Sequence, residues 1–367
     1  MFAKFPFCKN IFNHKHAIKH LNIKRIGVNA MTELEKSAQN GQAVGFMLIK
    51  SAEKKISVKG SPYLDLVLSD KDGEIPAKMW DYQGSENEYN AGEIIKVKGQ
   101  IDKWKNASQL RIERIRHTTP ADQVDMSTLV ATTDLAPEQM LAEIRATVDD
   151  FTDEGLKKLV TKLLDNCGDK LLICSAAVRM HHAMRGGLLF HTLSMLRVGK
   201  AVCSVYPFLR KELVYAGIIV HDLYKLKEIN YAETGLASEY TPVGGLIGHI
   251  VGGAIDIGLV GKELSIDPET VMLLEHIVLS HHEIPEYGSP IPPMFPEAEA
   301  VATIDRLDAS LFEMLAAVSE VEIGKTTGRV WGLDRKLYRH QDDTKYRLCT
   351  DQNDQNQTNR ISDGKKD

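Results

Sequence analysis

The amino-acid sequence predicts two domains, a small all-β barrel followed by an all-α domain. Short alternating segments broken by Gly, Pro and Asp fill residues 42–118, whereas apolar residues recur at helical spacing through residues 137–325. A polar segment that contains Pro120, residues 119–136, is typical of a linker between them. With 367 residues and 43% hydrophobic content, the chain is long enough to build two cores.

Five short strands are expected in the first domain. They cover residues 43–60, 63–70, 75–80, 94–102 and 108–115. The pair Asp72-Gly73 suits a tight hairpin turn, and residues 83–92 are expected to form a connection or a short helix between the third and fourth strands. Five short strands in one small domain imply a barrel, and this layout is that of an OB-fold.

Barrels of this kind bind single-stranded nucleic acid by stacking bases on aromatic rings and following the phosphates with cations. The candidate contact residues are Tyr63, Lys78, Trp80, Lys98 and Trp104. The same pattern fits a solvated barrel whose aromatic residues fill the core, and OB-folds also bind oligosaccharides and proteins. A net charge of −5 excludes a basic coat over the whole chain, so any nucleic-acid binding must come from a local patch.

Helices are expected throughout the second domain, because apolar residues recur there at intervals of three and four. They cover residues 137–151, 155–167, 187–206, 211–224, 245–260, 269–282 and 297–318. A β-hairpin near residues 227–241 is the one expected exception.

The chain ends and the cysteines indicate the compartment. Residues 1–41 are expected to be a partly disordered extension. The stretch 1–30 is basic and acid-free like a transit peptide, but it has no serine and one arginine, which favours an unstructured or upstream-start segment over a targeting peptide. Residues 326–367 are expected to form a polar tail. Five cysteines without CxxC spacing favour a cytoplasmic protein, and we see no apolar run near the roughly 20 residues that span a bilayer, so no membrane partner is expected.

Histidines are concentrated in the second domain. Eight of the thirteen fall between His181 and His282, close to acidic residues. Imidazole and carboxylate ligands together suit divalent ions such as Mn, Fe or Zn. Several members interrupt apolar helices, where an imidazole without a partner is costly. The candidate ligands are His191, His221, Asp222, His249, His281, His282 and Asp305.

Each candidate also has a structural interpretation. A single histidine on an apolar helix is more often a hydrogen-bonded core residue than a ligand, but a core would have to satisfy all seven groups separately. His221 and Asp222 are adjacent and diverge by roughly 100° on a helix, so one metal takes both only near a helix end or within a cluster. Asp308 follows Asp305 by one turn and is its rival for the last ligand position.

The order H…HD…H…HH…D resembles the HD-domain superfamily of metal-dependent phosphohydrolases. Within it, residues 181–192, 221–228 and 281–309 look like the YhaM-type 3′–5′ exoribonucleases, bacterial enzymes with an OB-fold in front of an HD domain. The resemblance covers about residues 42–320. Phe190 stands where the family commonly has an acidic residue, and Tyr224 replaces a small residue within HD-x-G-K. Neither departure removes a ligand.

This resemblance implies a metal-dependent 3′–5′ exoribonuclease that acts on single-stranded RNA, with single-stranded DNA as a second candidate, and releases nucleoside 5′-monophosphates. It implies two divalent ions, with Mn²⁺ expected and Fe, Co or Mg as alternatives. Asp222 would bridge the ions. The other ligands would divide into one set of His191, His221 and Asp305 and another of His249, His281 and His282.

Two cations have implied catalytic roles alongside Asp222. Lys225 lies three residues after Asp222 and would neutralise charge on the scissile phosphate, and Arg185 would clamp a phosphate. For both, the structural alternative is an ordinary salt-bridged surface residue. His181 and His182 are expected on the substrate side rather than as ligands, and a homo-oligomer is left open.

Two other classes of function compete with this interpretation. The first is an HD-type phosphohydrolase of nucleotides or cyclic dinucleotides, against which the barrel argues, since a mononucleotide enzyme needs no polymer groove. The second is a non-catalytic OB-fold adaptor that binds nucleic acid, against which the complete ligand set argues.

Overall fold

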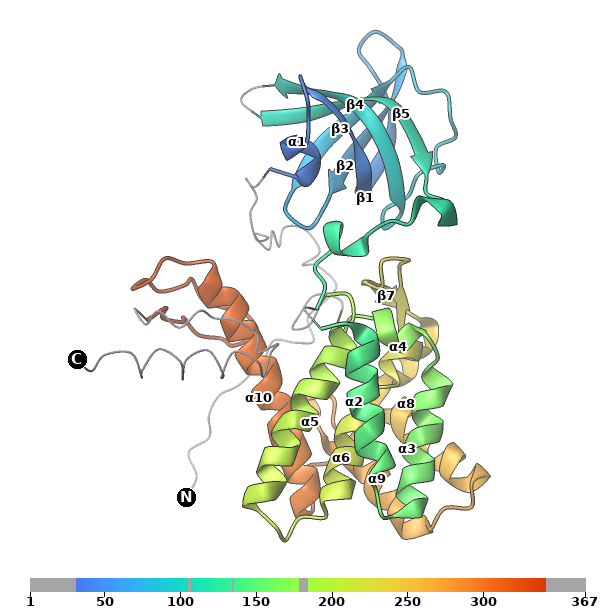
Figure 1. Ribbon diagram of the computed structural model, residues 1–367, viewed down its shortest axis with the longest axis vertical. Helices are drawn as coiled ribbons and strands as arrows, with labels where there is room; N and C mark the ends of the chain where they lie inside the picture. The colour runs from blue at the N-terminus through green and yellow to red at the C-terminus, as the bar shows by residue number, and fades with distance from the viewer. Residues whose placement is uncertain (1–30, 105–106, 134, 178–183, 341–367) are drawn as a thin grey trace, which may run out of the picture.

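The computed structural model describes residues 31–104, 107–133, 135–177 and 184–340. A β-barrel precedes a domain made mainly of helices (Figure 1), so the predicted two-domain fold class is confirmed. The predicted extension over residues 1–30, and the predicted tail from residue 341 onward, lie outside the described residues.

Five strands close the barrel. They are β1 (Gln42–Ile56), β2 (Pro62–Ser69), β3 (Glu74–Trp80), β4 (Ile94–Trp104) and β5 (Ala107–His117). Their order around the barrel is β1-β2-β3-β5-β4, with β3 and β5 parallel and the other pairs antiparallel. This is the Greek-key order of an OB-fold, and all five predicted strands are confirmed. Residues 81–93 contain turns and no helix, which decides between the two predicted forms of that connection.

Buried and partly exposed residues alternate along the strands, so one face of each strand fills the interior of the barrel. Leu64, Leu66 and Leu68 on β2 are each at most 1% exposed, while the residues between them face outward. The third to fourth strand connection adds Tyr82 and Tyr89, which are 5% and 6% exposed. These two tyrosines therefore fill the core and are not available for stacking on bases.

Asp70 ties the turn between β2 and β3 to the short helix α1 (Glu33–Lys36). Its Oδ1 accepts hydrogen bonds from the backbone N–H groups of Asp72 and Gly73 at 2.9 and 3.0 Å, and its Oδ2 accepts from Glu33 at 2.7 Å. Asp70 is only 9% exposed. One carboxylate thus satisfies three backbone donors that water reaches poorly.

The second domain contains nine α-helices within the described residues. They are α2 (Pro137–Asp149), α3 (Glu154–Cys167), α4 (Lys170–Ile173), α5 (Gly187–Val205), α6 (Lys211–Val220), α7 (Lys225–Glu228), α8 (Pro242–Glu263), α9 (Pro268–Ser280) and α10 (Pro296–Ser319). Strands β6 (Ile229–Tyr231) and β7 (Ala237–Tyr240) form the predicted hairpin. Three short 3-10 helices cover Pro120–Asp122, Met126–Thr128 and Pro285–Tyr287.

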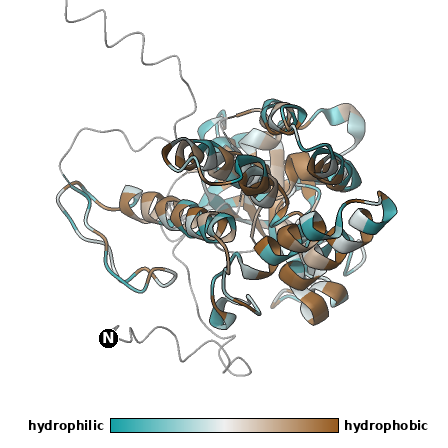
Figure 2. Ribbon diagram, turned by 90° about the horizontal axis from the view of Figure 1, so that it is seen from below, coloured by the Kyte–Doolittle hydropathy of each residue, from teal (hydrophilic) through white to brown (hydrophobic). Residues whose placement is uncertain are grey.

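One continuous hydrophobic core joins the larger helices, and hydrophobic residues run along them in Figure 2. The seven helices predicted from periodicity are confirmed, while the short helices α4 and α7 were not predicted. Helix starts follow local chemistry: Asp153, Thr241 and Asp267 cap α3, α8 and α9 by accepting a backbone hydrogen bond through the side chain.

Two helices, α5 and α8, are long and apolar enough by composition to cross a membrane. Polar or charged residues such as Arg197 in α5 and His249 in α8 interrupt both helices, so neither is an unbroken apolar run of about 20 residues. Core helices of globular domains pass the same test. In α5, eleven residues are buried in the helical domain.

The predicted linker contributes apolar packing that its overall polarity does not suggest. Leu129 and Val130 are 2% and 4% exposed and pack with Leu48 and Ile94 of the barrel. Leu236, between β6 and β7 of the helical domain, packs against the same residues. These five residues, which we call the joint cluster, connect the two domains through nonpolar contacts.

The first part of the predicted tail is structured. Isolated bridges join Thr326 to Tyr338 and Val330 to Arg335. The guanidinium of Arg339 donates to the carbonyl of Val321 at 2.6 Å, just beyond the end of α10. Residues 326–340 therefore fold back toward the last helix.

The turn at Asp70 yields a prediction about stability. Asp70→Ala removes the acceptor for three backbone donors, so we expect the barrel to lose about 1–3 kcal/mol of unfolding free energy. Urea-dependent hydrogen exchange of peptides from β1 to β3 in the intact chain measures this loss. Asp102→Ala removes an exposed carboxylate that is paired with Arg111 and should leave exchange unchanged. Equal effects of the two substitutions would contradict the role of Asp70.

Candidate metal centre

Seven side chains meet at one place inside the helical domain. They come from α5, the ends of α6 and α9, the middle of α8, and α10. They are His191, His221, Asp222, His249, His281, His282 and Asp305. Two groups, one of His191, His221 and Asp222 and one of His249, His281 and His282, each bring their ligand atoms within 4.8 Å of one another.

Two histidines of the centre stand directly after helices. His221 follows the last residue of α6, and His281 follows the last residue of α9. In each case Nδ1 donates to the carbonyl three residues earlier, Ile218 at 2.8 Å and Val278 at 2.7 Å. Because the helix ends there, the following residue can turn to the same site, which is how His221 and Asp222 meet despite being adjacent.

The other three imidazoles are held in the same way at Nδ1, through different acceptors. For His191 the partner is Asp308 Oδ2 at 2.7 Å, and for His249 it is Glu228 Oε2 at 3.0 Å. His282 Nδ1 lies 2.8 Å from the carbonyl of Tyr287. With Nδ1 of each ring facing an oxygen, Nε2 is the nitrogen presented to the centre.

Asp222 lies between the two histidine groups. Its Oδ2 is 3.3 Å from His221 Nε2 and 3.9 Å from His191 Nε2, whereas its Oδ1 is 3.5 Å from His249 Nε2. His281 Nε2 lies 3.9 Å from that same Oδ1. One carboxylate therefore presents a different oxygen to each group.

Asp305 spans the centre on a second path. Its Oδ1 is 3.2 Å from His191 Nε2, and its Oδ2 is 3.9 Å from His282 Nε2. The sequence interpretation places Asp305 with His191 and His221, whereas in the structure its second oxygen lies near His282 of the other group. Its rival Asp308 is turned to the far side of the His191 ring and accepts a hydrogen bond from the Ser194 hydroxyl.

Unpaired polar atoms provide a test of whether a cation fits here. In the described part of the chain, five buried side-chain nitrogen or oxygen atoms have no hydrogen-bond partner. Four of them are in this centre: His221 Nε2, Asp222 Oδ1, His249 Nε2 and His281 Nε2. Burying such atoms without a partner is costly. All four are nitrogen or oxygen atoms of the kinds that coordinate divalent metals. The residues present therefore fit a metal.

Burial and neighbouring charges set the protonation state of the candidate ligands. Burial raises the pKa of Asp222. Nearby cationic groups, above all Lys225, lower it by more, so this pKa lies well below its usual range. For His281 and His282 burial lowers the pKa, so both rings are neutral at pH 7. For His191 burial acts in the same direction, but hydrogen bonds to Asp305 and Asp308 outweigh it and raise the pKa to about 10.

Lys225 is the first residue of α7, and its ammonium lies 2.6 Å from Asp222 Oδ2. Burial lowers its pKa, but the Asp222 carboxylate outweighs burial and raises it. The lysine is therefore charged at neutral pH and lies at the edge of the centre.

Arg185 is held elsewhere in the domain. Its guanidinium donates to the carbonyl of Thr234 at 2.9 Å, and its backbone N–H donates to Ala131 in the linker. These contacts connect Arg185 to the β6–β7 hairpin and to the linker, not to the seven ligands. The neighbouring His181 and His182 lie outside the described residues.

On the barrel, three of the five predicted nucleic-acid contacts gather on one outer face. The rings of Tyr63 and Trp80 are 4.9 Å apart between centroids, and Trp80 is 46% exposed. Lys78 Nζ lies 4.9 Å from the Tyr63 centroid and 5.6 Å from that of Trp80. We call these three residues the aromatic face.

The other two predicted contacts are not part of this group. Lys98 lies on β4, where it pairs with Val44 and Arg114 and shares a surface hollow with Lys96. Trp104 ends β4, and its side chain is outside what the structure describes.

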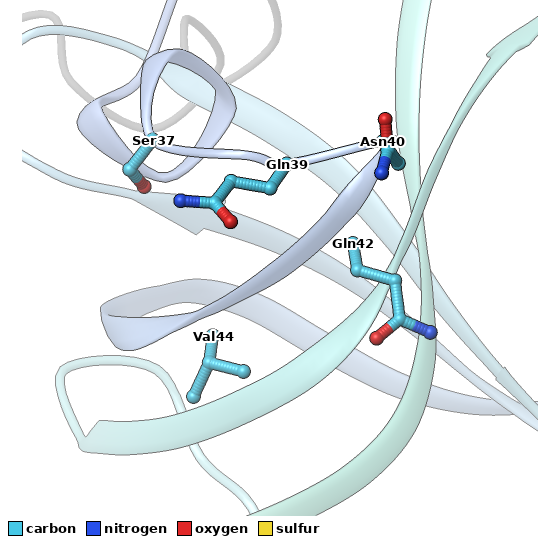
Figure 3. Close-up of a pocket in the computed structure, with 5 residues that line it drawn as sticks. All are labelled: Ser37, Gln39, Asn40, Gln42 and Val44. Atoms are coloured by element: carbon cyan, nitrogen blue, oxygen red, sulfur yellow. The ribbon is translucent and has the colours of Figure 1, made fainter.

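A second hollow beside the start of β1 has different chemistry (Figure 3). Its lining residues are Ser37, Gln39, Asn40, Gln42 and Val44. None of these side chains is charged, the Ser37 hydroxyl donates to the carbonyl of Leu34 with no histidine beside it in the lining, and none belongs to the metal centre. It is therefore not the catalytic site.

Two features of the centre are not evident from the sequence. Glu228 ends α7 and holds His249, but a glutamate in the charged stretch 225–228 looks like a solvated residue. Asp308 is visible only as a neighbour of Asp305. Its pairing with the outer nitrogen of His191 becomes apparent only when α5 and α10 are placed side by side.

Comparison with known proteins finds a family model that spans this centre. The HD domain family model matches residues 188–310, which include all seven ligands. Solved structures similar to the barrel include PriB of Ralstonia solanacearum (14% identity, TM-score 0.19, covering 22% of this chain and 98% of PriB). Another is the second OB-fold domain of replication protein A from Methanococcus maripaludis (15% identity, TM-score 0.18, covering 21% and 82%).

Curated relatives align over most of the chain. The 3′-5′ exoribonuclease YhaM of Listeria welshimeri is 39% identical over 294 residues, which is 80% of this chain and 93% of that protein. YhaM of Listeria innocua is 38% identical over the same shares of both chains. Identity at this level over both domains establishes the relationship: the chain belongs to the YhaM family of 3′-5′ exoribonucleases, with an HD domain that depends on divalent metal.

Proposed function

We propose that this protein is a cytoplasmic 3′–5′ exoribonuclease that uses two divalent ions, with Mn²⁺ favoured, to release nucleoside 5′-monophosphates from single-stranded RNA. The observation that carries the proposal is the buried centre, where four polar atoms without hydrogen-bond partners converge from separate helices. The family relationship supports the reaction and its direction.

The ligand set divides naturally between two ions. His191 and His221 face one oxygen of Asp222, and His249 and His281 face the other. When bound, a pair of divalent ions polarises a phosphodiester and lowers the pKa of a water that attacks phosphorus. Asp222 would bridge the pair, and the second oxygen of Asp305 supports a similar bridging role for that residue.

The protein's own cations complete the chemistry. Lys225 stays protonated beside Asp222 and can donate to an oxygen of the scissile phosphate as charge develops there. Arg185 uses one donor for Thr234, and a guanidinium carries five, so others remain for a phosphate farther along the strand. Burial of the ligands keeps bulk water from competing with the attacking water.

The barrel, which we assign to residues 42–118, would hold the strand ahead of the helical domain at 137–325. Bases stack on exposed rings with little regard to sequence, so the aromatic face supports general single-strand binding. In the free protein the ammonium of Lys78 lies over both rings and is also 3.7 Å from Asp65. A base that stacks there must move this lysine, which can then pair with a phosphate.

Loss of the bridging carboxylate tests the reaction. Asp222→Ala removes the oxygens shared by both ligand groups. We expect the activation barrier to rise by about 4 kcal/mol, which lowers the rate of hydrolysis about a thousandfold. Single-stranded RNA labelled at its 5′ end should give a descending ladder with Mn²⁺ and the wild-type protein, and none with the variant. Intact RNA alongside hydrolysed free nucleotides would instead indicate a nucleotide phosphohydrolase.

Loss of the aromatic face tests the role of the barrel. The double substitution Tyr63→Ala and Trp80→Ala should cost about 1–3 kcal/mol per stacked base in affinity for long RNA and leave hydrolysis of a dinucleotide unchanged. Fluorescence anisotropy and kcat/KM on both substrates measure this. Trp331→Ala, which removes an aromatic residue that is 74% exposed outside the barrel, is the control. Parallel losses on both substrates would exclude binding through this face.

The protonation of His191 predicts how metal affinity depends on pH. The pKa of about 10 means that the metal-free protein carries a proton on this ring at neutral pH, and an ion must displace it. Affinity should therefore rise with pH, about tenfold per unit between pH 7.5 and 8.5, because His281 and His282 are already neutral. Calorimetry in buffers of different ionisation enthalpy should detect the released proton. An affinity independent of pH would contradict this assignment.

A further inference from the structure

Helix α8 is broken immediately before one ligand. Gly248 has φ 73° and ψ 166°, far from helical values, so the helix is interrupted between its first turns and His249. Backbone with these angles is essentially restricted to glycine. The break makes His249 the first residue of a second helical segment, and the backbone N–H of a first residue has no acceptor within its own helix.

Glu228 supplies the missing acceptor and holds the ring as well. Its Oε1 accepts the backbone N–H of His249 at 3.1 Å, and its Oε2 lies 3.0 Å from Nδ1 of the same residue. Glu228 is 7% exposed. The helix also lies tightly against this residue, because a Cβ at Gly244 would come within 2.1 Å of the Glu228 carbonyl oxygen. Backbone and ring of His249 are thus both fixed by one buried carboxylate.

Hydrogen-bond chemistry makes the carboxylate necessary here. A backbone N–H only donates, and Nδ1 must also donate if Nε2 is to offer its lone pair to a cation. Both oxygens of Glu228 are therefore needed as acceptors. An amide of the same shape has one acceptor and one donor group, and it can satisfy both partners only if His249 moves its proton from Nδ1 to Nε2.

The equivalent contact at His191 differs in this respect. Asp308 accepts from Nδ1 of His191 through one oxygen, and its other oxygen accepts from the hydroxyl of Ser194. A hydroxyl can donate or accept. An amide at position 308 can therefore keep its oxygen on the ring and turn its NH₂ group to Ser194, without any change of tautomer.

We propose that Glu228 is a positioning residue that sets the tautomer of His249 and thereby controls cation affinity at the group formed by His249, His281 and His282. The inference rests on the proposed function only in requiring that this centre binds divalent metal. It makes the two ligand groups separable, since Glu228 contacts one of them and Asp308 the other.

The test compares Glu228→Gln with Asp308→Asn in the full-length protein. In metal-free samples with ¹⁵N-labelled histidine, two-bond ¹H–¹⁵N spectra identify the protonated ring nitrogen. We expect His249 to carry its proton on Nδ1 in the wild type and on Nε2 in Glu228→Gln, whereas His191 should keep its Nδ1 proton in Asp308→Asn. Titration with Mn²⁺ by calorimetry should show one of two ions weakened about 10–100-fold in Glu228→Gln.

Two further variants separate positioning from simple stability. Glu228→Asp keeps two acceptor oxygens on a shorter side chain, so it should retain the Nδ1 proton and bind both ions more tightly than the glutamine variant. Asp256→Asn removes a carboxylate that contacts Lys227 of α7 and should bind both ions like the wild type. If Glu228→Gln does not fold, the metal-free wild type still tests the assignment, because a proton on Nε2 of His249 there would overturn it.

Two outcomes overturn different claims. Wild-type binding of two Mn²⁺ ions, together with unchanged affinity and tautomer in Glu228→Gln, overturns the role of Glu228 and leaves the proposed function intact. Failure of the wild-type protein to bind Mn²⁺ in this centre overturns the proposed function itself. Neither measurement uses RNA or enzyme activity.

Discussion

The convergence of four imidazoles on the two oxygens of Asp222 is the arrangement on which the proposed metal centre depends. Four helical elements bring imidazole nitrogens to this carboxylate, and four polar atoms of the group are buried without a hydrogen-bond partner among the described residues. Such burial is costly for every polar atom left unpaired. Lys225 offsets only part of the cost, because one ammonium reaches one oxygen. The helical domain is therefore a fold whose least favourable region becomes favourable when metal binds.

Helix ends solve the problem of placing these ligands accurately. His221 and His281 each follow the last residue of a helix and anchor their rings on a carbonyl of the final turn. The break at Gly248 creates a third helix end, in this case a beginning, and Glu228 serves it. A ring fixed at Nδ1 by a rigid backbone loses little further conformational freedom when its other nitrogen binds a metal ion. The helices that hold these rings would therefore increase the affinity for metal without contacting it.

The periodicity of apolar residues was enough to predict the five strands, the larger helices and the hairpin, because burial alternates with the same period as the backbone. The seven candidate ligands could also be selected from the sequence, since a buried imidazole within an apolar helix is costly without a partner. Glu228 was not recognisable: its role depends on the break at Gly248, and one glycine among several in α8 carries no local sign of it. Tyr82 follows the exposed Trp80 by two residues but is buried, a difference that the sequence pattern does not indicate.

The joint cluster has a consequence for how the domains communicate. Leu236 belongs to the hairpin that follows α7 directly, and α7 carries both Lys225 and Glu228. Nonpolar side chains from the barrel, the connecting segment and this hairpin pack in one small cluster. The barrel is therefore in contact with the helical domain and is not attached only through a flexible linker. A rotation of the barrel about this contact would displace the hairpin first. The hairpin lies only a few residues after Lys225 and Glu228, for which we propose roles in phosphate and metal binding.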